Sequence, residues 1–119
     1  MPTITLSDGT SIEAENNKRL VLAIEDSGID ILHQCGGNAR CTTCRVHFVE
    51  GEPQRMTAAE RTRLEARGLI GQYRLSCQIL TYHDMSVEVI NHVSTANLGE
   101  AGPRPADQIT PIPTWMPKP

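Results

Sequence analysis

Apolar and polar residues alternate in several short stretches of the chain, which is the pattern of strands with one buried face. These stretches are residues 3–6, 12–14, 45–50, 74–79 and 86–90. The first two are separated by Ser7-Asp8-Gly9-Thr10, a sequence typical of a hairpin turn. In the fourth stretch, side chains two residues apart share a face, so Cys77 is expected to point inward with Leu75 and Ile79.

In residues 18–27 the apolar residues follow helical spacing instead. Leu20 is followed by Ala23 three positions later and by Ile24 four positions later. Gly28 follows at the position where glycine commonly ends a helix. We expect this helix to cross the sheet that the strands form.

A second, shorter helix is predicted to begin at Thr57. The Thr57 hydroxyl is placed to accept a hydrogen bond from the Glu60 amide, and the Glu60 carboxylate is placed to reach back to the cap. Gly68 is expected to end this helix. Strands interspersed with two helices indicate an α+β fold.

The composition changes after residue 93, because six of the eight prolines lie in residues 94–119. We therefore divide the chain into a domain, residues 1–93, and a Pro-rich C-terminal tail, residues 94–119. Such a composition favours a flexible or polyproline-like extension. The alternative is that the apolar residues of the tail dock on the domain or on a partner; these are Ile109, Ile112, Trp115 and Met116.

Composition also limits the classes of function. The chain has 119 residues and a formal net charge of -3, without a basic run or aromatic platform for nucleic acid. No stretch approaches the roughly 20 apolar residues of a membrane span, and the N-terminus lacks the pattern of a signal peptide. A monomer in the cytoplasm is expected. Since thiols stay reduced there, the four cysteines suggest a metal or redox site.

Three of those cysteines, Cys35, Cys41 and Cys44, lie within ten residues, and Cys77 follows far along the chain. A structural zinc site usually has two paired doublets, whereas only Cys41 and Cys44 form one here. A thioredoxin-like Cys-x-x-Cys motif normally opens a helix, whereas this one precedes a strand. A Rieske cluster needs two histidines at ligand spacing, and His33 has no such partner. Zinc remains the minor alternative.

A diiron cluster needs four thiolates and a loop that directs backbone N–H groups at the sulfurs. Gly36 and Gly37 allow a close approach of the backbone, and the small Thr42 and Thr43 carry hydroxyls that can donate to sulfur.

The spacing Cys35-x5-Cys41-x2-Cys44, with the distant Cys77, resembles that of adrenodoxin-like members of the 2Fe-2S ferredoxin family. The resemblance covers about residues 3–93 and implies a β-grasp fold with a mixed sheet crossed by a helix. It further implies a 2Fe-2S cluster ligated by the four cysteines, with Cys35 and Cys41 on the iron nearer the surface. The implied chemistry is one-electron carriage, from Fe(III)Fe(III) to Fe(III)Fe(II), and not enzymatic catalysis.

The implied partners are a ferredoxin reductase and redox acceptor proteins, with basic docking faces because the chain and its cluster are negatively charged. An acidic docking patch near the first helix is a weaker hypothesis; it comprises Glu13, Glu15, Glu25, Asp26 and Asp30. The alternative function is a redox-sensing or complex-bound module. Surface or strand positions are expected for His33, His47, His83 and His92, and a solvated face for Arg40 and Arg45.

Overall fold

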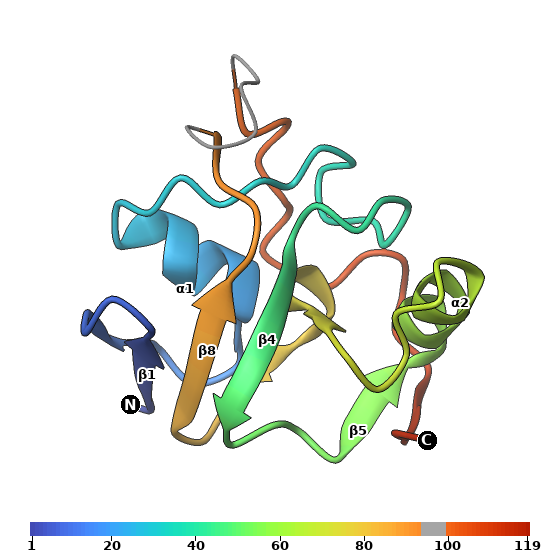
Figure 1. Ribbon diagram of the computed structural model, residues 1–119, viewed down its shortest axis with the longest axis horizontal. Coiled ribbons are helices and arrows are strands. Elements are labelled where there is room, and N and C mark those ends of the chain that lie inside the picture. The colour runs from blue at the N-terminus through green and yellow to red at the C-terminus, as the bar shows by residue number, and fades with distance from the viewer. Residues whose placement is uncertain (94–99) are drawn as a thin grey trace.

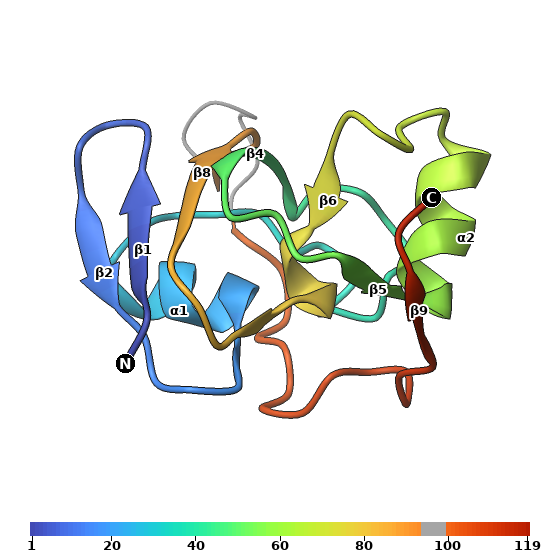
Figure 2. The same cartoon turned by 90° about the horizontal axis from the view of Figure 1, so that it is seen from below.

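The computed structural model describes residues 1–93 and 100–119. Within them, five strands form the main sheet in the order β2-β1-β8-β4-β6 (Figure 1 and Figure 2). The strands are β1 (Thr3–Leu6), β2 (Ser11–Glu13), β4 (Arg45–Glu50), β6 (Arg74–Leu75) and β8 (Met85–Val89). Strand β1 runs parallel to β8 and the other neighbours are antiparallel, so the sheet is mixed, as predicted.

The first helix, α1 (Leu20–Asp26), supplies a large part of the core, because residues 20–24 are all buried. It begins two residues later than predicted. The reason is that β3 (Lys18–Arg19) first pairs antiparallel with β7 (Leu80–Thr81). Its end is as predicted, since Gly28 adopts a φ of 98° and its N–H bonds to the Glu25 carbonyl.

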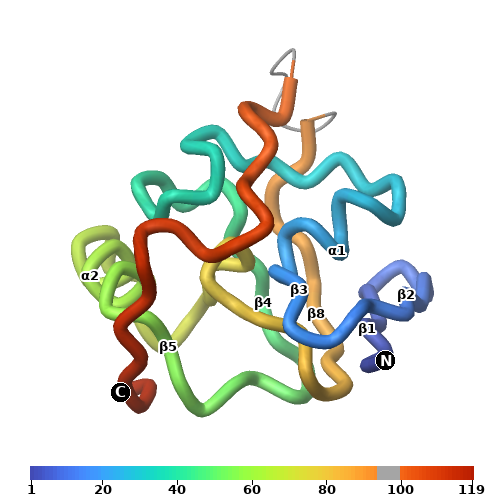
Figure 3. Tube along the Cα trace, turned by 180° about the vertical axis from the view of Figure 1, so that it is seen from behind, coloured from blue at the N-terminus to red at the C-terminus, as the bar shows by residue number. Residues whose placement is uncertain are grey.

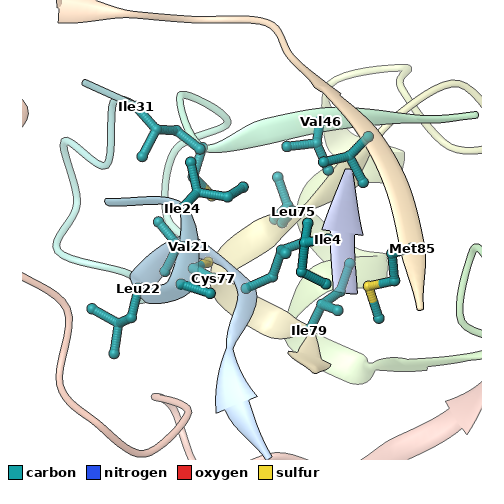
Figure 4. Close-up of a cluster of buried hydrophobic side chains, with 14 of the residues drawn as sticks. Ile4, Val21, Leu22, Ile24, Ile31, Val46, Leu75, Cys77, Ile79 and Met85 are labelled. Carbon is teal, nitrogen blue, oxygen red and sulfur yellow. The ribbon is translucent and has the colours of Figure 1, made fainter. Parts of the chain in front are cut away.

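Side chains from α1, from the sheet and from the segment around Cys77 pack into one core (Figure 4). Cys77 lies among core residues such as Val21 and Leu75, and none of these three side chains is exposed. Its thiol is therefore held by the same packing that holds the fold together.

The single strand predicted for residues 74–79 is wrong. The chain leaves the sheet after Leu75, forms a 3-10 turn, η1 (Ser76–Gln78), and then continues into β7. The cause is local, because Ser76 donates from both its hydroxyl and its backbone N–H to the Cys44 carbonyl. This pulls the turn toward the cysteine loop, and Cys77 points inward although it is not in a strand.

The second helix, α2 (Ala58–Ala66), begins as predicted, with the Thr57 hydroxyl accepting from the Glu60 amide. The Glu60 carboxylate does not reach back to the cap. It accepts instead from the Arg74 guanidinium at 2.7 Å and from the Leu75 amide at 2.8 Å, in a fully buried position. Burial raises the pKa of the Glu60 carboxyl, while Arg74 acts in the opposite direction. This ion pair anchors the strand that leads to Cys77.

The described part of the tail, residues 100–119, packs against the domain, so the expectation of an extension is wrong for it. Strand β9 (Trp115–Pro117) pairs antiparallel with β5 (Arg55–Thr57), next to α2 (Figure 2). The side chain of Ile109 is buried, whereas Ile112 is 92% exposed. Residues 94–99 lie outside the described residues, so the boundary at residue 93 remains a prediction.

No helix among the described residues is long and apolar enough to cross a membrane.

Candidate functional site

The segment from Cys35 to Cys44 forms neither helix nor strand and lies directly before β4. Cys35 and Cys41 are partly exposed, while Cys44 is 1% exposed. The turn η1 brings in the fourth cysteine, Cys77, which is 0% exposed. All four are free thiols. The four residues selected from the sequence thus divide into a half-exposed pair and a buried pair.

Cys35 and Cys41 form the half-exposed pair. A hydrogen bond from Cys41, helped by the backbone N–H groups of residues 38, 40 and 41, lowers the pKa of Cys35 to about 4. The same contact raises the pKa of Cys41, because one proton is shared between two thiols. Oγ1 of Thr43 lies 3.1 Å from Sγ of Cys41, as the sequence predicted for a loop threonine. Thr42 Oγ1 instead accepts from Arg45.

Cys44 and Cys77 form the buried pair. Contact with Cys77, together with burial, raises the pKa of Cys44. The pKa of Cys77 is lowered by Cys44, by the Gln78 amide, by the positive charge of Arg19 and by the backbone N–H of Ala39. Ala39 has a φ of 56°, in the left-handed region that favours glycine.

This donor set fits a 2Fe-2S cluster. Two irons each take two thiolates, and the thiols of this chain are grouped two and two. Among the described residues, no three Cys, His, Asp or Glu side chains are grouped as ligands of a single metal ion. Backbone N–H groups contribute to lowering the pKa of one thiol in each pair, Cys35 and Cys77, and a lowered pKa favours the thiolate form that binds iron.

Gly37 allows other parts of this chain to come close to the loop, whereas the sequence suggested that it lets the loop backbone come close to the sulfurs. Its φ is 82°, and a Cβ there would stand 2.7 Å from Cβ of Pro105 and 2.8 Å from Nη2 of Arg19. A side chain at this position would therefore displace the tail from the cysteine loop.

The family model described as the 2Fe-2S iron-sulfur cluster binding domain matches residues 4–81. The chain belongs to this family. Its cofactor is a 2Fe-2S cluster, and its class is that of ferredoxin-type electron-transfer domains. The sequence resemblance and the predicted cofactor are thereby confirmed.

A 2Fe-2S ferredoxin of Haemophilus influenzae is 32% identical over 97 residues, which cover 75% of this chain and 86% of that protein. An ISC-like 2Fe-2S ferredoxin from Pseudomonas putida has a similar structure, with a TM-score of 0.65 and 26% identity over 77% of this chain and 94% of that one. The β-grasp prediction is therefore confirmed.

A component of the Na(+)-translocating NADH-quinone reductase of Chlamydia felis is 35% identical over 86 residues, which cover 72% of this chain. This chain spans only 20% of the length of that component. The similarity therefore concerns one ferredoxin domain within a larger protein.

Two residues of this ferredoxin domain were missed by sequence reasoning. Arg19 is fully buried and donates from Nε and Nη2 to the Cys77 carbonyl, at 2.9 and 2.7 Å. Gln78 places Nε2 3.6 Å from Sγ of Cys77. Gln78 could have been suspected from its position beside a ligand candidate. Arg19 gives no local signal, because an arginine before a helix is usually solvated.

The surface position expected for His33 is also wrong. Its side chain is 1% exposed, and Nε2 lies 2.9 Å from Oε2 of Glu25 without the alignment of a hydrogen bond. His47 is exposed on β4, as expected.

The acidic patch proposed near the first helix is partly neutralised within the ferredoxin domain itself. Asp26 forms ion pairs with Lys18 at 2.6 Å and with Arg104 of the tail at 2.8 Å. The Arg104 and Lys18 hydrogen bonds lower the pKa of Asp26 to about 2. Asp30 pairs with His92 at 2.9 Å. These acids are therefore less available to a partner than the sequence suggested.

Proposed function

We propose that this chain is a one-electron carrier whose 2Fe-2S cluster is ligated by Cys35, Cys41, Cys44 and Cys77. The grouping of these thiols into a half-exposed and a buried pair is the observation that carries the proposal. When bound, the cluster takes up and returns one electron. The protein holds the thiolates, directs N–H groups at sulfur and leaves one side of the loop open.

The open side is the route that we propose for the electron. Cys35 and Cys41 are partly exposed, in keeping with the family expectation that the first two cysteines hold the iron nearer the surface. A redox partner that docks over them approaches the site without crossing the core. We propose a ferredoxin reductase as the donor and a redox protein as the acceptor.

The net charge of -3 supports long-range attraction to partners with a basic face. The four free thiols support the proposal that the protein functions in the reducing cytoplasm. We also propose that the carrier is a monomer, which sedimentation of the iron-loaded protein tests directly.

Anaerobically purified protein should contain two irons and two acid-labile sulfides per chain. It should show the visible absorption of a 2Fe-2S cluster, bleached by one electron. With NADPH, a ferredoxin reductase and cytochrome c as the acceptor, it should mediate electron transfer in a concentration-dependent way. Colourless protein with stoichiometric zinc and no iron or sulfide would refute the proposed function.

A complex-bound module is the second candidate, favoured by the similarity to the NADH-quinone reductase component, of which this chain spans 20%. Such a module accepts and passes electrons only within its complex. A loaded cluster that is reduced chemically, yet does not turn over between reductase and cytochrome c, would favour this candidate over a diffusible carrier.

A further inference from the structure

Arg19 lies at the position before α1, and its buried guanidinium bonds to three separate parts of the chain. It donates five hydrogen bonds to four backbone carbonyls. The acceptors are Cys77 in η1, Gly37 in the cysteine loop, and Ala106 and Gln108 in the tail. This side chain therefore joins the buried half of the site to the tail.

All of these acceptors are neutral. Among residues 1–93 and 100–119, Arg19 has no carboxylate within ion-pair distance, although its side chain is 0% exposed. A buried cation without a counter-charge is unfavourable. Burial lowers the pKa of Arg19, and negative charge on Cys77, Cys44 and Cys35 acts in the opposite direction. Thiolates at the cysteine site would therefore supply the counter-charge of Arg19.

Gln78 directs an N–H donor at the same site. The Thr57 hydroxyl donates to Oε1 at 2.7 Å, which fixes the orientation of the amide. Nε2 then lies 2.9 Å from the Thr110 carbonyl of the tail and 3.6 Å from Sγ of Cys77. One amide group thus links the tail to a thiol of the buried pair.

The tail completes this arrangement by covering it. Figure 3 shows the tail, in orange and red, running from beside the cysteine loop across the back of the molecule to β5. Its residues 105–110 contribute the Ala106, Gln108 and Thr110 carbonyls, and Ile109 packs inward with 7% exposure. Pro105 meets the loop at Gly37.

We propose that Arg19 and Gln78, held in place by tail residues 105–110, raise the reduction potential of the cluster. This rests on the proposed function, with Cys44 and Cys77 as ligands. Reduction adds a negative charge to the cluster. A site from which water is excluded disfavours that charge unless the protein stabilises it. A fixed guanidinium and an N–H donor to sulfur stabilise that charge, and the low dielectric strengthens their effect. Arginine keeps its charge at all physiological pH values.

The test is the midpoint potential of the iron-loaded full chain, measured by spectroelectrochemical titration. Arg19→Met should shift the potential to a more negative value, and Arg19→Lys should shift it less because the charge is kept. The control is Arg104→Met, which removes the same charge from a tail side chain that is 51% exposed. It should leave the potential unchanged. Equal potentials for Arg19→Met and Arg104→Met would overturn the proposal.

Gln78→Met, a nearly isosteric change, is a second test of the proposal for the case that Arg19→Met does not fold or does not load iron. It should also shift the potential to a more negative value, because an N–H donor to Cys77 is lost. Iron-loaded Gln78→Met with the wild-type potential, together with Arg19→Met that loads no iron, would show a purely structural role and overturn the proposal. Wild-type protein without iron and sulfide would instead refute the proposed function.

Discussion

Both halves of the cysteine site consist of two cysteine side chains, but the surroundings of the two halves differ. Cys44 and Cys77 are enclosed by the core, by Arg19 and by the tail, whereas Cys35 and Cys41 lie partly exposed in a loop. The buried half is therefore suited to holding a cofactor and setting its properties. The exposed half is suited to exchange with a partner. On the proposed function, burial, and not ligand type, separates these two tasks.

The largest expected effect comes from removing one thiol from each half. Cys77→Ser should lose the cluster, because no water can replace the ligand in the core and a hydroxyl is a poorer ligand for iron. Cys35→Ser should retain more iron, since solvent reaches this half. Iron and sulfide analysis of anaerobically purified variants measures the difference. Wild-type occupancy in Cys77→Ser would show that the ligand assignment is wrong.

The anchor of the buried half gives the next largest effect. Glu60→Gln breaks its buried pair with Arg74, and losing one member of such a pair costs about 3–5 kcal/mol in the free energy of unfolding. The control is Glu65→Gln in the exposed pair with Arg61, with an expected cost of about 0.5 kcal/mol or less. Urea midpoints of the iron-loaded variants, followed by visible absorbance, compare the two. Equal midpoints would contradict the anchoring role.

The tail offers a comparison between two isoleucines three residues apart. Ile109→Ala should lower the free energy of unfolding by about 2–3 kcal/mol, because the side chain is buried at 7% exposure. Ile112→Ala should change it by less than about 0.5 kcal/mol, since Ile112 is 92% exposed. Denaturation curves of the full chain measure both values. Similar values for both variants would mean that the tail does not dock as described.

The smallest predicted effect concerns the exposed half. Arg40 lies in the loop beside Cys41 and is exposed, whereas the exposed Arg55 lies on β5 at the other end of the molecule (Figure 1). Arg40→Glu should slow oxidation of the reduced protein by anionic ferricyanide by about threefold at low salt, through local repulsion. Arg55→Glu, with the same change in net charge, should have little effect. If both variants slow the oxidation equally, the electron does not leave the protein through the exposed half.

Much of this fold was predictable from sequence because its signals are local. The alternation of residues 3–6 and 45–50 follows from one buried face, and the Thr57 cap follows from a hydrogen bond over three residues. The spacing of the cysteines likewise indicates the cofactor without any knowledge of the fold.

The features that sequence reasoning missed depend on distant parts of the chain. The Arg19 acceptors lie up to 89 positions away, and no local pattern brings them together. Glu60 leaves its expected cap because Arg74, 14 positions later, binds it more fully. Residues 74–79 fail to form one strand because Ser76 bonds to Cys44. In each case a tertiary hydrogen bond overrides a local preference.

The most direct test of the division into two halves is the proton NMR spectrum of the reduced protein. The β-protons of cysteines bound to ferric and to ferrous iron differ in the size and temperature dependence of their shifts. Those of Cys35 and Cys41 should behave as protons of ferrous ligands, and those of Cys44 and Cys77 as protons of ferric ligands. The reverse assignment, with Cys44 and Cys77 on the ferrous iron, would contradict electron exchange through the exposed half.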